Sequence, residues 1–117
     1  MADGFFEQSD LWVHGEGGYF LYRIPAMVTT ATGTVLAFCE ARKHTGTDHD
    51  DIDLVMRRSD DGGLSWGTQQ IVVAGGSETC GNPCPIVDED TGIVWLLFCK
   101  NNQLIFSTFS DDNGITW

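Results

Sequence analysis

The chain has 117 residues, 42% of them hydrophobic, which suits one small globular domain or part of a larger one and argues against disorder. Its formal net charge is −11, with only six basic residues. Such a charge repels phosphate backbones and anionic lipid, so nucleic-acid and membrane-surface partners are disfavoured. The sequence also has no apolar run of membrane-spanning length.

The first twelve residues, MADGFFEQSDLW, lack the basic start and the apolar stretch of a secretory signal peptide. The protein is therefore expected to be cytoplasmic or to be secreted from a longer precursor, and the compartment stays open. Residues 1–20 are expected to form a lead-in segment ahead of the first strand.

A first structural unit is predicted over residues 21–75. Its four strands are expected near residues 24–30, 34–41, 52–58 and 69–73, which are rich in β-branched and aromatic residues. The 14 glycines of the chain are about twice the usual share and are typical of many tight turns.

A second unit, over residues 80–117, repeats the first. Strands are expected near residues 85–88, 93–99 and 104–109, and NPCPIVDEDTGIVWLLFCK aligns with the earlier RIPAMVTTATGTVLAFCEA. No stretch shows convincing helical periodicity. A four-stranded antiparallel unit that recurs about every 50 residues is the blade of a β-propeller, so an all-β fold of antiparallel blades is predicted.

The pattern Ser-x-Asp-x-Gly-x-x-Trp ends the third strand of each unit. The aspartate can accept hydrogen bonds from nearby backbone amides, the glycine can take a positive φ, and the tryptophan can fold back as an apolar plug. Both copies are interpreted as structural hairpin staples rather than catalytic groups. Their members are Ser59, Asp61, Gly63, Trp66, Ser110, Asp112, Gly114 and Trp117.

The first unit carries an insertion that the second lacks. From the Phe-Cys cysteine to the serine of the box, the chain runs through residues 39–59 in the first unit and only through residues 99–110 in the second. The extra stretch is essentially residues 40–51. Insertions in one repeat often form loops on the binding face, so this loop is the candidate place for function.

Two arginines are predicted to meet at the open end of the first hairpin. If Thr32 and Gly33 form a two-residue turn, Arg23 lies directly opposite Arg42, whereas a three-residue turn with a bulge shifts the pairing by one. Directly opposed like charges are unfavourable, so the pair is expected to bind a carboxylate, which a guanidinium fork matches bidentately. The alternative is that each arginine pairs separately with Glu40 or a nearby aspartate.

Together these motifs resemble the exo-α-sialidases with Asp boxes. YRIP at 22–25, EAR at 40–42, Asp48 and the two boxes occur in that order, and NPCP at 82–85 is similar to the second-blade strand of that family. The resemblance covers roughly residues 10–117. It implies a six-bladed propeller, of which this chain holds about the first two blades, and a retaining hydrolase of terminal sialic acids.

The resemblance also implies roles for single residues. Asp48 would be the general acid/base, Arg23 the first of three arginines that clamp the sialic acid carboxylate, and Arg42 a pocket residue near the carboxylate and the 4-hydroxyl. The tyrosine nucleophile, its glutamate and two further arginines are expected from later blades, so this part alone is expected to be inactive and to expose an apolar face. The other substrate-binding residues implied are Ile24, Pro25 and Asn82.

The acid role requires that Asp48 is protonated when it acts. Nearby Asp50, Asp51 and Asp53 would raise its pKa, whereas Arg42 would lower it. The sequence leaves open which effect prevails.

The expected partners are sialylated glycans: glycoproteins, gangliosides or oligosaccharides. No cofactor and no metal are expected, because the three histidines form no spaced ligand set and the acidic run at 48–53 lacks the glycine and glutamate of a calcium loop. The alternative function is a non-catalytic Asp-box propeller that binds glycans or proteins.

Overall fold

Seven strands form two antiparallel sheets in the computed structural model, which describes residues 4–117. The first three residues of the predicted lead-in segment 1–20 lie outside the described residues. Within residues 4–117, no helix has the length and apolarity needed to span a membrane. The first sheet contains β1 (Leu21–Thr29), β2 (Val35–Arg42), β3 (Ile52–Ser59) and β4 (Gln70–Val73), and the second contains β5 (Cys80–Val87), β6 (Val94–Lys100) and β7 (Leu104–Ser110).

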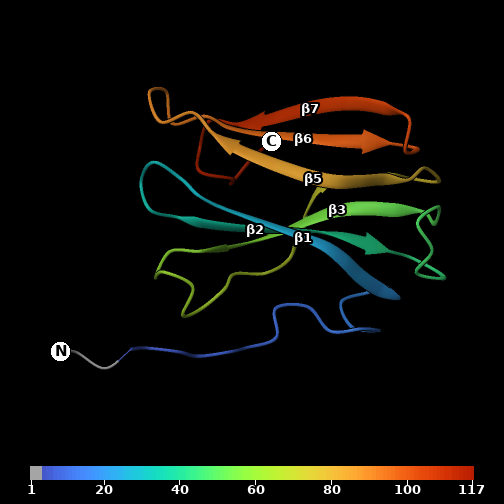
Figure 1. Ribbon diagram of the computed structural model, residues 1–117, viewed down its shortest axis with the longest axis horizontal. Coiled ribbons are helices and arrows are strands. Elements are labelled where there is room, and N and C mark those ends of the chain that lie inside the picture. The colour runs from blue at the N-terminus through green and yellow to red at the C-terminus, as the bar shows by residue number, and fades with distance from the viewer. Residues whose placement is uncertain (1–3) are drawn as a thin grey trace.

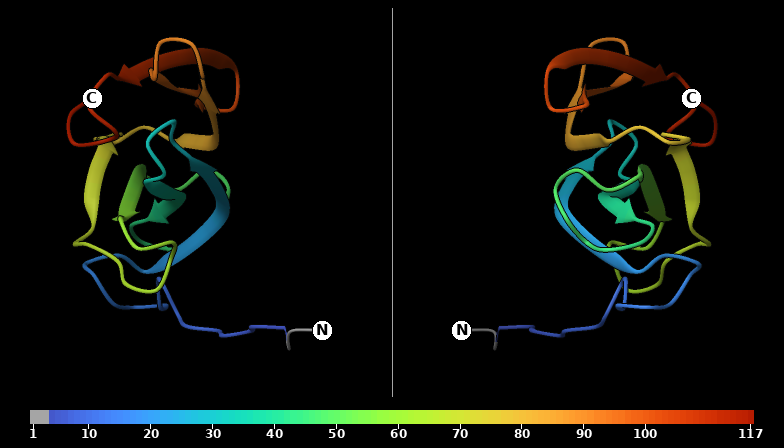
Figure 2. Two further views of the ribbon diagram at one scale, coloured as in Figure 1. Left: turned by 90° about the vertical axis from the view of Figure 1, so that its left-hand side faces the viewer. Right: turned by 90° about the vertical axis from the view of Figure 1, so that its right-hand side faces the viewer.

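The two sheets lie side by side, each a meander of neighbouring strands (Figure 1). Seen end on, the first sheet lies between the lead-in segment and the second sheet, and the two sheets do not close into a ring within the described residues (Figure 2). This arrangement agrees with the predicted all-β fold of antiparallel blades.

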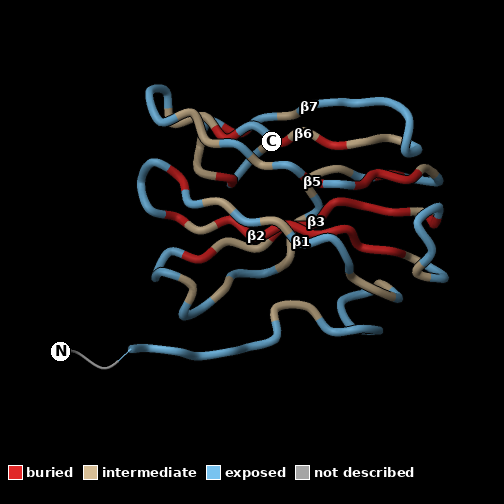
Figure 3. Tube along the Cα trace, viewed as in Figure 1, coloured by how far each residue is buried: buried red, intermediate tan, exposed pale blue. Residues whose placement is uncertain are grey.

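The core lies between the two sheets, and the buried stretches concentrate in their central strands (Figure 3). A second, smaller cluster lies on the other face of the first sheet, where Trp12 and Tyr19 of the lead-in segment pack against Cys39 and Val55. β2 and β3 are buried on both faces, and each contains adjacent apolar residues, at 35–39 in β2 and at 54–56 in β3, rather than a strict alternation of apolar and polar ones. The main core residues are Leu36, Phe38, Leu54, Met56, Cys80, Val94, Leu96 and Phe98.

The first strand of each sheet begins earlier than expected and contains a β-bulge. In β1 the register shifts between Arg23 and Ala26, and in β5 it shifts between Gly81 and Cys84. Each bulge holds a proline, which has no N–H to give to the ladder and is tolerated in sheets at such irregularities. These two prolines, Pro25 and Pro83, therefore lie inside the strands and not at their first residues.

The turn of the first hairpin has three residues, not two. Thr30 donates its backbone N–H to the carbonyl of Thr34 at 2.8 Å, and Gly33 takes a φ of +92° in between. A positive φ at this position is typical of a three-residue hairpin loop. Next to the turn, Thr29 pairs with Val35.

This turn and the bulge together change which residues face each other at the open end of the hairpin. Arg23 pairs with Glu40, and Arg42 pairs with Leu21. The direct opposition of Arg23 and Arg42, predicted from a two-residue turn, is therefore wrong. The shift of one residue expected from a three-residue turn occurs, and the bulge adds a second.

The Asp boxes are closed by a repeated set of hydrogen bonds. In the first box, the Ser59 hydroxyl accepts the Gly63 N–H and donates to the Asp61 carboxylate, both at 2.8 Å. The backbone N–H of Ser65 donates to the same carboxylate at 2.8 Å. In the second box the corresponding residues are Ser110, Asp112, Gly114 and Thr116.

The hydroxyl one place before each tryptophan also donates to the aspartate, which the pattern at the sequence level did not include. These hydroxyl groups, Ser65 and Thr116, lower the pKa of Asp61 and Asp112 to about 2, with help from the backbone amides. The boxes therefore keep their charge far below neutral pH.

The second box also joins the two sheets. The Trp117 ring meets the Phe38 ring edge to face, with centroids 5.7 Å apart. Arg58 donates from Nε to the Asn113 carbonyl at 2.9 Å. The second box thus contributes to the contact between neighbouring sheets as well as to its own hairpin.

Replacing Gly114 by alanine should destabilise the protein more than the matching change at Gly63. Both glycines have a φ above +80°, which costs an alanine about 1–2 kcal/mol. Only at Gly114 would the new methyl group also press on Leu36, at 3.0 Å, adding roughly 1–3 kcal/mol. Urea unfolding of the two variants checks this order, and equal losses would contradict it.

Candidate active site

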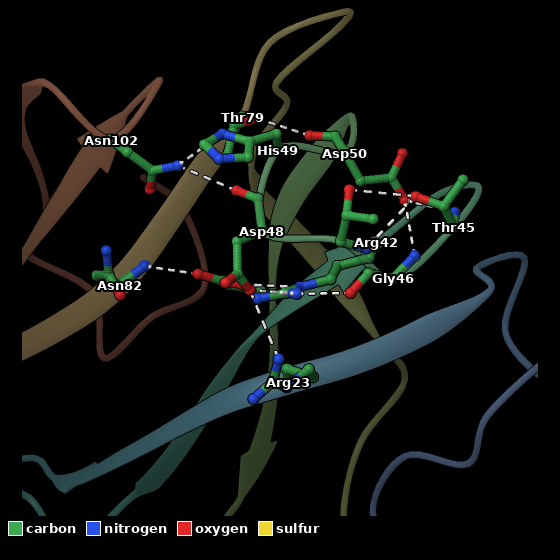
Figure 4. A network of polar contacts seen from close by, with 12 residues as sticks. Arg23, Arg42, Thr45, Gly46, Asp48, His49, Asp50, Thr79, Asn82 and Asn102 are labelled. Atoms are coloured by element: carbon green, nitrogen blue, oxygen red, sulfur yellow. Dashed lines mark hydrogen bonds and ion pairs between the residues drawn. The ribbon is translucent and has the colours of Figure 1, made fainter.

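A cleft of about 420 Å³ opens beside the loop between β2 and β3, where the two sheets meet. It brings together Arg23 from β1, Arg42 from β2, Asp48 from that loop and Asn82 from β5 (Figure 4). Ile24 also lines it, whereas Pro25 lies in a separate groove beside the lead-in segment. The other lining residues are Glu40, His49 and Asn102.

Arg42 is almost completely buried, with 2% of its surface exposed, and is fixed by hydrogen bonds on every side of its guanidinium. Its Nε and Nη2 lie 3.1 and 2.6 Å from Glu40 Oε2. Its Nη1 donates to the Gly46 carbonyl at 2.7 Å and to Asp48 Oδ1 at 2.8 Å. Arg42 is therefore a rigid cation whose charge is shared between two carboxylates.

Glu40 also links the two sheets. Its Oε1 accepts the backbone N–H of Asn82 at 3.0 Å. Any side chain at position 81 would collide with this carboxylate, so Gly81 allows the close approach. From the sequence, Glu40 is expected only as an alternative partner for the arginines, although residues 40 and 42 share one face of a strand.

Arg23 is the more accessible of the two cleft arginines, with 51% of its side chain exposed. Its Nη1 lies 3.5 Å from Asp48 Oδ1, and the Asp48 side chain is 71% exposed. The two arginines therefore meet at this aspartate, and Arg23 keeps donors that can reach a ligand in the cleft.

Arg42 decides the ionisation of Asp48. Its hydrogen bond and its charge, in that order, lower the pKa of the Asp48 carboxyl below its usual value. Asp48 is therefore ionised at neutral pH.

The other aspartates of this region have partners of their own. Burial raises the pKa of Asp50, but backbone N–H groups, among them those of His44 and Thr45, outweigh it, and the net effect is a lowered pKa. Asp53 pairs with Lys43 at 3.2 Å and accepts the Tyr19 hydroxyl at 2.6 Å. The acidic neighbours therefore do not raise the pKa of Asp48 as the sequence allowed.

Within residues 4–117, no group of three or more histidine, cysteine, aspartate or glutamate side chains converges in a way that could hold a metal ion.

Ile24 has a backbone φ of +56°, in the bulge that turns the chain towards the cleft. A β-branched residue is strained in this conformation, by about 1–2 kcal/mol. Asn82, at the matching bulge of β5, has a φ of +55° and tolerates it better. Strain of this kind tends to occur at functional sites.

Replacing Ile24 by asparagine should therefore raise the free energy of unfolding by about 1 kcal/mol, since the strain is partly relieved. Urea unfolding measures it, with Ile86→Asn as a control at an exposed isoleucine of β5. A lower stability for Ile24→Asn than for the control would contradict the strain.

Comparison with protein-family models matches residues 33–117 to the BNR repeat-like domain. The match covers most of the chain, which therefore belongs to the BNR repeat-like domain family.

Relatives with this region are named as sialidases. The chain is 44% identical over 101 residues to an exo-alpha-sialidase of Aspergillus fumigatus, covering 81% of this chain and 24% of the relative. It is 38% identical over 135 residues to a sialidase of Micromonospora viridifaciens, covering 96% and 21%. The chain thus spans less than a quarter of the length of these curated relatives.

Solved structures agree with the fold. The Hadza microbial sialidase Hz136 superposes with a TM-score of 0.80 at 26% identity, over 88% of this chain and 26% of that one. The NanB sialidase from Streptococcus pneumoniae superposes with a TM-score of 0.70 at 20% identity, over 77% and 17%, which supports the fold alone. The prediction of blades from a sialidase-type propeller is confirmed.

Proposed function

We propose that this chain is part of an exo-α-sialidase, a glycoside hydrolase that removes terminal sialic acids from glycoproteins, gangliosides or oligosaccharides with retention of configuration. The observation that carries the proposal is the meeting of Arg23, Arg42 and Asp48 in one cleft. The sialidase names of the relatives support it. Residues 21–75 and 80–117 are assigned to two consecutive blades and residues 1–20 to a lead-in.

Arg23 is proposed to hold the substrate carboxylate. A sialoside carries this group on its anomeric carbon, so a fixed cation places the scissile bond as well as binding the sugar. Each charge-assisted hydrogen bond of this kind is worth roughly 1.5–3 kcal/mol. Arg42, buried and held by Glu40, lines the pocket behind it. Ile24 and Asn82 complete the proposed wall, and Pro25 supports the bulge that carries Ile24.

Asp48 is proposed to be the general acid/base. A bound carboxylate would compete with Asp48 for the arginine donors and add a negative charge beside it, and both effects raise the pKa of Asp48. The protonated carboxyl can then give its proton to the glycosidic oxygen while the carbon–oxygen bond electrons leave with that oxygen. The resemblance assigns the tyrosine nucleophile, its glutamate and two further arginines to later blades.

Assay of the full-length protein tests this proposal. It should release sialic acid from an α-sialoside and leave an uncharged hexoside intact, and proton NMR should show the α-anomer of the product first. Saturable binding of the sialoside without turnover would favour the alternative, a non-catalytic propeller that binds glycans.

Replacing Arg23 by methionine should lower kcat/KM for α-sialosides by about 10- to 100-fold, mainly through KM, since a charge-assisted contact worth roughly 1.5–3 kcal/mol is lost. Arg23→Lys keeps the charge but lacks the planar guanidinium fork, so its kcat/KM should lie between those of the unchanged protein and of Arg23→Met. Steady-state kinetics on the full-length variants measure this. A Met variant with unchanged KM would remove Arg23 from the binding role.

A further inference from the structure

We propose that Asn102, on the turn between β6 and β7, is a positioning residue for Asp48, so that the second sheet sets the place of the acid. The inference rests on the proposed function. It concerns how Asp48 is held in position. Asn102 lies on a turn of the second sheet, whereas the loop that carries Asp48 joins two strands of the first sheet.

Packing alone does not hold Asp48 in place. Its side chain is 71% exposed, and the neighbouring residues at the tip of the loop are exposed too. The first half of the loop is organised by Asp50, whose Oδ2 accepts the N–H groups of His44 and Thr45 at 2.7 and 2.9 Å. Within residues 43–51, no N–H or O–H group donates a hydrogen bond to the carbonyl of Asp48.

The turn between β6 and β7 and the residue directly before β5 supply partners for two carbonyls of the loop (Figure 4). Asn102 donates from Nδ2 to the Asp48 carbonyl at 3.0 Å. Thr79 donates from its hydroxyl to the Asp50 carbonyl at 2.6 Å. Asp48 and Asp50, alternate residues of the loop between β2 and β3, are thus both bonded to residues that adjoin strands of the second sheet.

The turn that carries Asn102 is itself fixed. Asn101 and Asn102 have φ values of +53° and +55°, as a type I′ hairpin turn requires. The Asn101 N–H donates to the Thr79 carbonyl at 2.7 Å, and its side-chain oxygen accepts the Thr79 N–H at 3.1 Å. Thr79 is therefore hydrogen-bonded both to the turn that carries Asn102 and to the loop that carries Asp48.

This anchor differs from the arginine contacts of Asp48 in one respect. A substrate carboxylate competes with Asp48 for the guanidinium groups, because both are anions that need the same donors. The Asn102 bond is made to the Asp48 backbone, so it persists when the arginine bonds are redistributed. It can therefore keep the acid within reach of the glycosidic oxygen during the reaction.

The test uses the full-length protein and two substrates, a natural α-sialoside with a poor leaving group and an aryl α-sialoside with a good one. Asn102→Gly removes the side chain and keeps the positive φ. It should lower kcat/KM at least 10-fold for the natural substrate and less than about 2-fold for the aryl substrate, because only the first needs a well-placed acid. Asn102→Asp, of equal size without the donor, should show the same selective loss.

Gln103→Ala is the matched control, since Gln103 is an exposed residue next to Asn102. It should leave both rates unchanged. Equal losses on both substrates, or no loss on either, for the two Asn102 variants would overturn the positioning role.

Asp48→Asn, measured in parallel, separates this inference from the proposed function. If Asp48→Asn is selective and the Asn102 variants are not, only the positioning role fails. If Asp48→Asn shows no selective loss, the acid assignment fails and the inference fails with it.

Discussion

Replacing Asp48 by asparagine should abolish turnover of natural α-sialosides and spare substrates with good leaving groups. An amide cannot give a proton to the glycosidic oxygen, and general acid catalysis contributes about 10²–10⁴-fold to such reactions. A leaving group that departs as a stable anion needs no such proton. The ratio of kcat/KM values for the two substrates, measured on the full-length protein, is the quantity to compare.

The fold should survive this change. The Asp48 side chain is largely exposed, and an asparagine keeps an oxygen that can accept the hydrogen bond of Arg42. Asp60→Asn is a matched control, because Asp60 is 69% exposed and lies at the Asp box, away from the cleft. If Asp48→Asn slows both substrates equally, Asp48 binds or supports the site but does not act as the acid.

The strands and the boxes could be predicted because their signals are local. Apolar runs such as those of β2 and β3 are bounded by glycine turns, and the box pattern contains most of the residues that close it. The repeat added a second, independent copy of each signal. Even the three-residue turn at Gly33 was one of two alternatives that the sequence allowed.

The arrangement of the cleft could not be predicted in the same way. The bulge at Ile24 depends on a positive φ in a β-branched residue, which no propensity favours. It turns Arg23 towards Glu40 in the ladder, and the two arginines meet at Asp48 instead of facing each other. Only the prolines within the two bulges, Pro25 and Pro83, were visible signals.

Hydrogen bonds between the two sheets could not be predicted from the sequence either. The Glu40–Asn82 and Asn102–Asp48 hydrogen bonds join residues that are more than forty positions apart. Whether Arg42 or the acidic neighbours control the pKa of Asp48 depends on which aspartates find partners elsewhere, as Asp50 does. Such partners are set by docking of the second sheet on the first.

Replacing Glu40 by alanine should lower the free energy of unfolding by about 3–5 kcal/mol, because it leaves Arg42 buried with half of its hydrogen bonds unmade. It also leaves the backbone N–H of Asn82 without its acceptor. Urea unfolding of the full-length protein measures the loss. Activity should fall too, because the guanidinium that contacts Asp48 would no longer be fixed.

A double variant distinguishes an uncompensated charge from a simple loss of packing. Glu40→Leu with Arg42→Met removes both charges and keeps most of the volume, so it should recover much of the stability that Glu40→Ala loses, since replacing a buried ion pair by apolar groups is often neutral. Its activity should stay low, because Arg42 is part of the proposed pocket. If the double variant is as unstable as Glu40→Ala, the link from Glu40 to Asn82 in the second sheet, and not the charge of Arg42, is what the glutamate supplies.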